Sequence, residues 1–103
     1  MLGKNNFTLQ IKEEAKHDIK YAVKWYDDID KKLGTRFVYE LETIFNNIIY
    51  NPKTYKKVYK NFRQAALHKF PYVVLYEPEK TTVIIYSLFN TRQNPKKKLR
   101  RLQ

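Results

Sequence analysis

The pattern of hydrophobic positions divides the chain into a helical first half and an extended second half. Between residues 7 and 11 apolar and polar residues alternate, which is typical of a short strand with one buried face. Spacings of three and four residues then predict two helices, and the second ends at Asn51-Pro52 because proline cannot continue a helix. The apolar face of the first helix consists of Ala15, Ile19, Ala22, Tyr26 and Ile29, and that of the second consists of Leu33, Phe37, Leu41, Ile44, Phe45 and Ile48.

A polar segment at residues 27–34 separates the two helical patterns, so we expect an antiparallel helical hairpin with a short loop. Gly34 is interpreted as the residue that permits the tight turn between the helices. Trp25 and Tyr26, late in the first helix, are interpreted as anchors of the hairpin on the sheet.

Runs rich in β-branched and aromatic residues follow and predict strands at 62–70, 72–77 and 81–89. Residues 77–80 predict a hairpin turn, whereas Pro71 is interpreted as a kink or bulge rather than a full reversal. The predicted fold is α+β: a small antiparallel β-sheet covered on one face by an N-terminal helical hairpin, in the order β-α-α-β-β-β. We expect one domain at residues 1–95 and a basic C-terminal tail at 96–103.

The predicted strand at 81–89 has apolar residues on both faces. Strict alternation places Val83, Ile85 and Phe89 on one face and Ile84, Tyr86 and Leu88 on the other. Two helices can cover only one of these faces. We therefore expect the second face to be covered by the chain's own tail or by a partner protein.

The net charge is confined to the second half of the chain. Residues 1–42 contain eight Lys or Arg and eight Asp or Glu, whereas residues 43–103 contain thirteen Lys or Arg and only two acids, which leaves a formal charge of +11. Cations without acidic neighbours attract polyanions and gain affinity by releasing counterions from phosphates. The distribution indicates a nucleic acid or an acidic protein as a partner.

Composition narrows the classes of function. The chain has no cysteine and two histidines without clustered carboxylates, so we expect neither a metal nor another cofactor. The apolar runs are shorter than the ~20 residues that a membrane-spanning helix needs. The N-terminus lacks the apolar core of a signal peptide. We therefore expect a cytoplasmic protein that does not engage a membrane.

Short strings along the chain carry a family resemblance. They are Trp25-Tyr26, Leu33-Gly34-Thr35-Arg36-Phe37, Asn51-Pro52-Lys53-Thr54-Tyr55, Phe70-Pro71-Tyr72 with Tyr76 beyond it, and Phe89-Asn90-Thr91-Arg92-Gln93-Asn94-Pro95. In this order, and with the expected elements, they resemble the RelE/ParE family of bacterial toxins, the toxic halves of type II toxin–antitoxin modules. The strings are closer to the ParE-like branch than to the RelE-like ribonuclease branch.

The resemblance implies a toxin that is neutralised by a cognate acidic antitoxin, whose segment covers the exposed sheet face or a helical groove. ParE-like members poison DNA gyrase without catalysing a reaction, whereas RelE-like members cleave messenger RNA within the ribosome. Whether the protein is an enzyme depends on this choice of branch. A third alternative is a non-toxic basic module that only binds its antitoxin or nucleic acid, and a homodimer is left open.

The RelE-like alternative requires groups that transfer protons and cations that hold the phosphate. The candidate catalytic residues are Arg63, Arg92, Tyr76 and His68. Arg63 and Lys69 are expected on one strand face, and Arg92 is expected to converge with Arg63 on one phosphate. Asn90 stands where many family members carry a histidine, and an amide cannot shuttle protons near neutral pH. This departure favours the ParE-like interpretation.

The ParE-like mode requires only a basic, aromatic-containing surface and a basic tail. The residues predicted to contact nucleic acid or the target protein are Lys56, Lys57, Lys60, Arg63, Lys69, Arg92, Lys96, Lys97, Lys98, Arg100 and Arg101. Tyr55 and Tyr59 are interspersed among the first of them.

Overall fold

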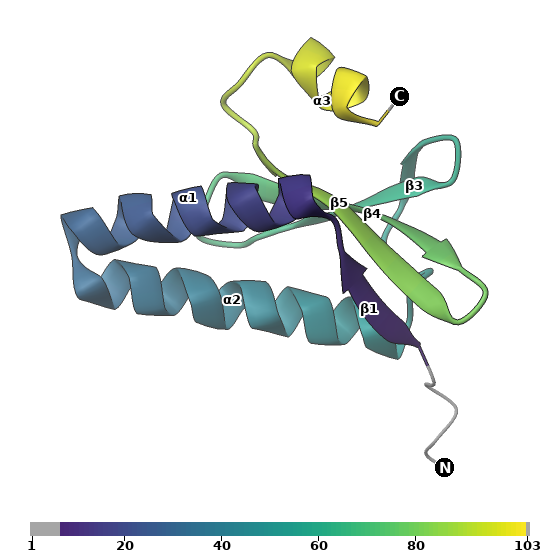
Figure 1. Cartoon of the computed structure of the whole chain (residues 1–103), viewed down its shortest axis with the longest axis horizontal. Helices are drawn as coiled ribbons and strands as arrows, with labels where there is room; N and C mark the ends of the chain where they lie inside the picture. The colour runs from purple at the N-terminus through teal and green to yellow at the C-terminus, as the bar shows by residue number, and fades with distance from the viewer. Residues whose placement is uncertain (1–6, 103) are drawn as a thin grey trace.

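The computed structural model describes residues 7–102 and forms one five-stranded sheet with helices on both faces (Figure 1). The elements are β1 (Thr8–Ile11), α1 (Glu13–Ile29), α2 (Lys31–Tyr50), β2 (Lys57–Tyr59), β3 (Phe62–Ala66), β4 (Tyr72–Glu79), β5 (Thr82–Asn90) and α3 (Pro95–Arg101). The strand order is β1-β5-β4-β3-β2, with β1 parallel to β5 and the other pairs antiparallel. The predicted α+β fold with a helical hairpin against the sheet is confirmed, and β2 and the parallel pair are additions to it.

The helical hairpin has a joint of one residue in place of the predicted loop. Asp30 is both the C-cap of α1 and the N-cap of α2, and its Oδ1 accepts a hydrogen bond from the Lys32 N–H at 2.9 Å. The polar residues at 27–34 lie within the two helices, where they resemble a loop only because many of them face solvent. Gly34 therefore serves close packing of the helices rather than a turn, since a Cβ there would meet the Asp27 side chain and lie 3.3 Å from Asp27 Cα.

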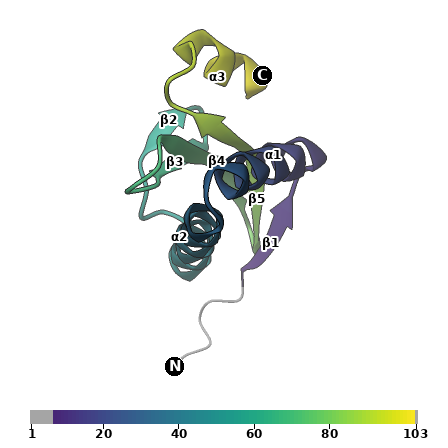
Figure 2. The same cartoon turned by 90° about the vertical axis from the view of Figure 1, so that its left-hand side faces the viewer.

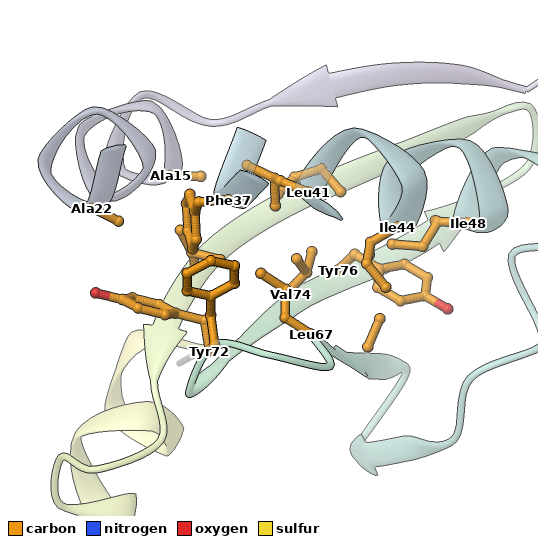
Figure 3. Packing of buried hydrophobic residues seen from close by; sticks show 14 of the residues in the cluster. Ala15, Ala22, Phe37, Leu41, Ile44, Ile48, Leu67, Tyr72, Val74 and Tyr76 are labelled. Atoms are coloured by element: carbon orange, nitrogen blue, oxygen red, sulfur yellow. The ribbon is translucent and has the colours of Figure 1, made fainter. Parts of the chain in front are cut away.

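The main core lies between the helical hairpin and the sheet, as Figure 3 shows. Phe37, Leu41, Ile44 and Ile48 of α2 pack on strand residues such as Val74. The predicted apolar face of α1 is confirmed up to Tyr26, but Ile29 is 60% exposed. Ile29 is the last residue of α1, and this end of the helix projects beyond the sheet in Figure 1.

A β-bulge in β5 corrects the predicted faces of that strand. Leu75 pairs with Ser87 and Tyr76 pairs with Ile85, so Tyr86 is an extra residue on β5. Alternation reverses there, and Leu88 joins Val83 and Ile85 against the helices while Phe89 lies on the opposite face. The prediction that Phe89 shares a face with Val83 is therefore wrong.

The second face of the sheet is covered by the chain's own tail. Phe62, Val73, Leu75, Phe89 and Leu102 form a second buried cluster, and Leu102 is only 6% exposed. Figures 1 and 2 show α3 on the side of the sheet opposite α2. Of the two predicted covers, tail or partner, the structure has the tail.

A carboxylate of α1 accepts a hydrogen bond from a backbone N–H of β5 that lacks a strand partner. β1 ends opposite Ile85, and beyond this point the Asp18 Oδ2 accepts from the Leu88 N–H at 3.1 Å. Asp18 thereby takes the place of a neighbouring strand.

None of the helices within residues 7–102 combines the length and apolarity needed to cross a membrane.

Candidate functional site

Arg63 and Tyr76 lie opposite each other on β3 and β4 and both bind the loop that follows α2. The Tyr76 hydroxyl donates to the Pro52 carbonyl oxygen at 2.7 Å. Arg63 Nη1 donates to the Tyr55 carbonyl oxygen at 2.6 Å and lies 3.4 Å from that of Lys53. We call this arrangement the loop clamp. It fixes residues 52–55 against the sheet, so both side chains have structural partners.

The environment of Tyr76 keeps its hydroxyl neutral. The side chain is completely buried, and this burial raises the pKa of Tyr76 to about 12, although the Arg63 charge opposes the shift. The Tyr55 ring lies edge-on to the Tyr76 ring with centroids 6.4 Å apart. A hydroxyl in this position is poorly placed to exchange protons with a substrate in solvent.

His68 and Lys69 lie in a loop and not on the predicted strand, because β3 ends at Ala66. Around Pro71 the chain makes a full reversal, where the Leu67 N–H donates to the Tyr72 carbonyl oxygen at 3.0 Å. The predictions of a strand to residue 70 and of a kink at Pro71 are therefore wrong. Lys69 shares no strand face with Arg63.

Glu40 of α2 holds this loop in place. Its Oε2 accepts from the His68 N–H at 2.6 Å and lies 3.3 Å from the Lys69 nitrogen. The backbone of the loop is thereby fixed, while the His68 and Lys69 side chains are exposed to solvent. Long-range contact between a carboxylate and loop N–H groups leaves no periodic signal in the sequence.

Arg92 is remote from Arg63, contrary to the expected convergence on one phosphate. Arg63 pairs with Tyr76, whereas Asn90, which precedes Arg92, pairs with Tyr72. About 13 Å of β4 separate these two positions. Arg92 is exposed at the end of β5, and its N–H donates to the Asn90 side-chain oxygen at 2.8 Å. The structure therefore places the candidate catalytic residues in separate regions.

Seven of the predicted binding cations fall into two clusters, whereas Arg63, Lys69 and Arg92 lie outside them. The first contains Lys56, Lys57 and Lys60 around β2, and the second contains Lys96, Lys97, Lys98 and Arg100 on α3. All of them are exposed except Lys98, whose Nζ donates to the Gln64 Oε1 of β3 at 2.8 Å. The side chain of Arg101 lies outside the described part of the chain.

An exposed apolar stripe on α1 was not predicted. Tyr21, Trp25 and Ile29 follow each other at four-residue intervals and are 70%, 56% and 60% exposed. Trp25 is therefore not an anchor of the hairpin on the sheet, whereas Tyr26 packs edge-on to Phe70 at 4.8 Å. The four-residue spacing of Tyr21, Trp25 and Ile29 in the sequence could have revealed this second apolar stripe on the helix.

A groove of about 550 Å³ adjoins this stripe between α1 and the end of β5. The α1 side is lined by His17, Asp18, Lys20, Tyr21 and Lys24, and the other wall contains Tyr72, residues 88–90 and Gln93. Burial raises the pKa of Tyr72, while a hydrogen bond with the Asn90 side chain opposes the shift.

Within residues 7–102 no three His, Asp or Glu side chains gather into a candidate metal site.

The fold and the two separate surfaces define a small basic α+β domain with a helical hairpin on a five-stranded sheet. Among solved structures the chain is similar to a protein described as the chromosomal ParDE TA system from P. aeruginosa, with a TM-score of 0.72 and 10% sequence identity. The similarity covers 84% of this chain and 98% of the other. At this identity it demonstrates a shared fold.

The family is shown by the sequence itself. Residues 9–95 match the family model described as the ParE toxin of type II toxin–antitoxin system, parDE. The chain therefore belongs to the ParE toxin family of type II toxin–antitoxin systems, which confirms the resemblance found in the sequence. No curated protein matches the chain.

Proposed function

We propose that this ParE-family toxin acts by binding DNA gyrase and catalyses no reaction of its own. The observation that carries the proposal is the loop clamp, because it engages Arg63 and Tyr76 in bonds to the backbone of residues 52–55. A binding toxin can use these residues as scaffold. A ribonuclease would need them at the scissile phosphate.

The RelE-like alternative is further weakened by the positions of the other candidates. His68 and Arg92 lie near the Tyr72 end of β4, about 13 Å along the strand from Tyr76. Proton transfer requires groups within hydrogen-bond reach of the same substrate. Four residues divided between two regions therefore favour a binding mode over acid–base catalysis.

The family pairs the toxin with an antitoxin, and we infer that an acidic antitoxin segment occupies the groove along α1. The outer face of the sheet is unavailable because α3 covers it. Tyr21 lines the groove as an apolar anchor, and Trp25 lies one turn further along the same stripe of α1. Lys20 and Lys24 of the groove wall attract an acidic chain.

A supercoiling assay with purified gyrase tests the target. We expect the wild-type protein to inhibit supercoiling and Tyr76→Phe and His68→Ala to inhibit it to the same extent, because binding needs neither proton. His17→Ala is the matched control, since it changes the other histidine of the chain. Absence of inhibition, together with codon-positioned cuts in messenger RNA that Tyr76→Phe abolishes, would establish the ribonuclease instead.

Growth separates the toxin from the non-toxic module. We expect expression of the protein alone to arrest bacterial growth and co-expression of the antitoxin to restore it. Soluble, folded protein that leaves growth unchanged would support the third alternative.

The antitoxin site is tested by exchanging exposed aromatic residues on two faces. We expect Trp25→Ser to weaken antitoxin binding by at least about 2 kcal/mol, as at a buried aromatic hot spot. Tyr39→Ser is the matched control, because Tyr39 is 72% exposed but lies on α2 and belongs neither to the groove nor to the α1 stripe. Equal losses in both variants would place the antitoxin elsewhere.

A further inference from the structure

Two basic segments that are far apart in the sequence meet on the outer side of β3. Gln64 bonds to both of them: its N–H donates to the Lys56 carbonyl oxygen at 3.2 Å, and its Oε1 accepts from Lys98 Nζ at 2.8 Å. Leu102 is buried with Phe62 of β3, and Val58 and Tyr59 of β2 pack on the same cluster. The fold therefore holds α3 over the β2–β3 hairpin.

The resulting surface carries six exposed cations, which we call the basic surface. They are Lys56, Lys57, Lys60, Lys96, Lys97 and Arg100. Neither contributing segment contains an acidic residue, and the acids of this half of the chain, Glu77 and Glu79, both lie on β4. Glu77 accepts a hydrogen bond from the Tyr86 hydroxyl at 3.4 Å. The six cations thus form one positive field from two segments.

The chemistry of this surface favours nucleic acid over protein. Lysine is depleted at the centre of protein interfaces, where a long charged side chain loses hydration and rotamer freedom. A phosphate backbone, in contrast, attracts hydrated lysines and is bound through the release of its counterions. The exposed aromatic residues that suit a protein partner lie on the α1 stripe instead.

The aromatic residues beside the basic surface distinguish duplex from single-stranded nucleic acid. Single strands are bound by stacking bases on exposed rings. Here the Tyr59 ring stacks on Phe62 at 6.5 Å and has Lys60 Nζ 5.3 Å from its centroid, while Phe62 contacts Tyr86 edge-on at 4.9 Å. These rings are occupied within the fold, so the surface presents charge without stacking platforms.

We propose that the basic surface binds the phosphate backbone of duplex DNA without sequence preference. The proposal concerns DNA binding by the toxin alone and does not depend on the identity of its enzyme target. A toxin with this surface would reach a DNA-bound target by first associating with the DNA itself.

Salt dependence of binding to a fluorescently labelled duplex of arbitrary sequence tests the proposal. The full chain is titrated by fluorescence anisotropy between about 50 and 200 mM KCl, where each phosphate contact contributes about −0.9 to the slope of log K against log salt. We expect the triple variant Lys56→Gln/Lys57→Gln/Lys60→Gln to lose up to about 2.7 of this slope and to bind on the order of 10²-fold more weakly. Lys96→Gln/Lys97→Gln/Arg100→Gln should have the same effect, since both segments form one surface.

The matched control is Lys31→Gln/Lys32→Gln/Arg36→Gln. It removes the same number of exposed cations at the start of α2, at the end of the helical hairpin that points away from β3 (Figure 1). We expect its slope to equal that of the wild type, and circular dichroism checks that all three variants are folded. Equal losses in the control, no binding by the wild type at about 50 mM salt, or an effect in only one of the two segments would overturn the proposal. Tighter binding to the single strand than to the duplex would also overturn it.

Discussion

Replacing Tyr76 by phenylalanine removes one hydroxyl from the loop clamp and leaves the buried ring in place. The hydroxyl donates to the Pro52 carbonyl oxygen at 2.7 Å, and the side chain has no exposed surface. At neutral pH the variant loses this bond and leaves a buried carbonyl without its donor. We expect a loss of about 1–2 kcal/mol in the free energy of unfolding.

The pH dependence of the free energy of unfolding measures a second effect of Tyr76, the cost of ionising its buried hydroxyl. Burial raises the pKa of Tyr76 from 10.0 to about 12 in the folded protein, so folding favours the neutral phenol. The resulting contribution to the free energy of unfolding is fully present below pH 10. It is lost as the pH rises toward 12, because Tyr76 ionises at lower pH in the unfolded chain than in the folded protein. The loss is at most about 1.4 kcal/mol per pH unit, or roughly 2–3 kcal/mol across the window.

Urea unfolding of wild type and Tyr76→Phe at a series of pH values from 8 to about 11.5 measures both effects. We expect the stability gap between the two proteins to be largest at pH 8 and to shrink as the pH rises above 10. Other tyrosines and the lysines titrate in both proteins, so the difference isolates Tyr76. A gap that stays constant up to pH 11.5 would refute the argument from burial.

Four further substitutions at three positions test how the helices are fixed to each other and to the rest of the fold, and each is measured by urea unfolding. Gly34→Leu should cost more than about 2 kcal/mol because the side chain would force α1 from α2 at Asp27. Gly34→Ala should cost less, because a single methyl group needs only the Asp27 side chain to move and the 3.3 Å approach to Asp27 Cα to widen slightly. Glu40→Ala should cost about 1–2 kcal/mol and raise amide exchange in the 67–71 loop, and unchanged exchange would contradict its role there. Asp18→Ala should likewise destabilise by about 1–2 kcal/mol, while a neutral result would show that solvent replaces the carboxylate.

The helices and the order of elements could be predicted because burial imposes a period on the sequence. Phe37, Leu41 and Ile48 are buried as their spacing indicates. The bulge at Tyr86 could not be predicted, since alternation continues through it in the sequence and only the pairing with β4 reveals the extra residue. The short strand β2 could not be predicted either, because its three residues include only one aliphatic residue, Val58, and so show no alternating pattern.

The candidate site was predictable in composition but not in arrangement. The cations of the basic surface were identified from the absence of acids around them. The partners of Arg63 and Tyr76 are carbonyl oxygens of the 52–55 loop, and any residue type supplies such an oxygen. Sequence patterns therefore identified the polar residues without showing that two of them are structural.

The pairing of β1 with β5 also determines when the fold can form. Thr8 lies beside Thr82, 74 positions later in the chain, so the sheet cannot be completed before β5 has left the ribosome. Until then α1 and α2 can pair with each other, but their apolar faces have no sheet to contact. Contacts of such large sequence separation form slowly, because loop-closure entropy must be overcome before they contribute stability. We therefore expect a delay between synthesis of this chain and the appearance of its binding surfaces, a period in which an antitoxin or a chaperone can engage the exposed helical hairpin first.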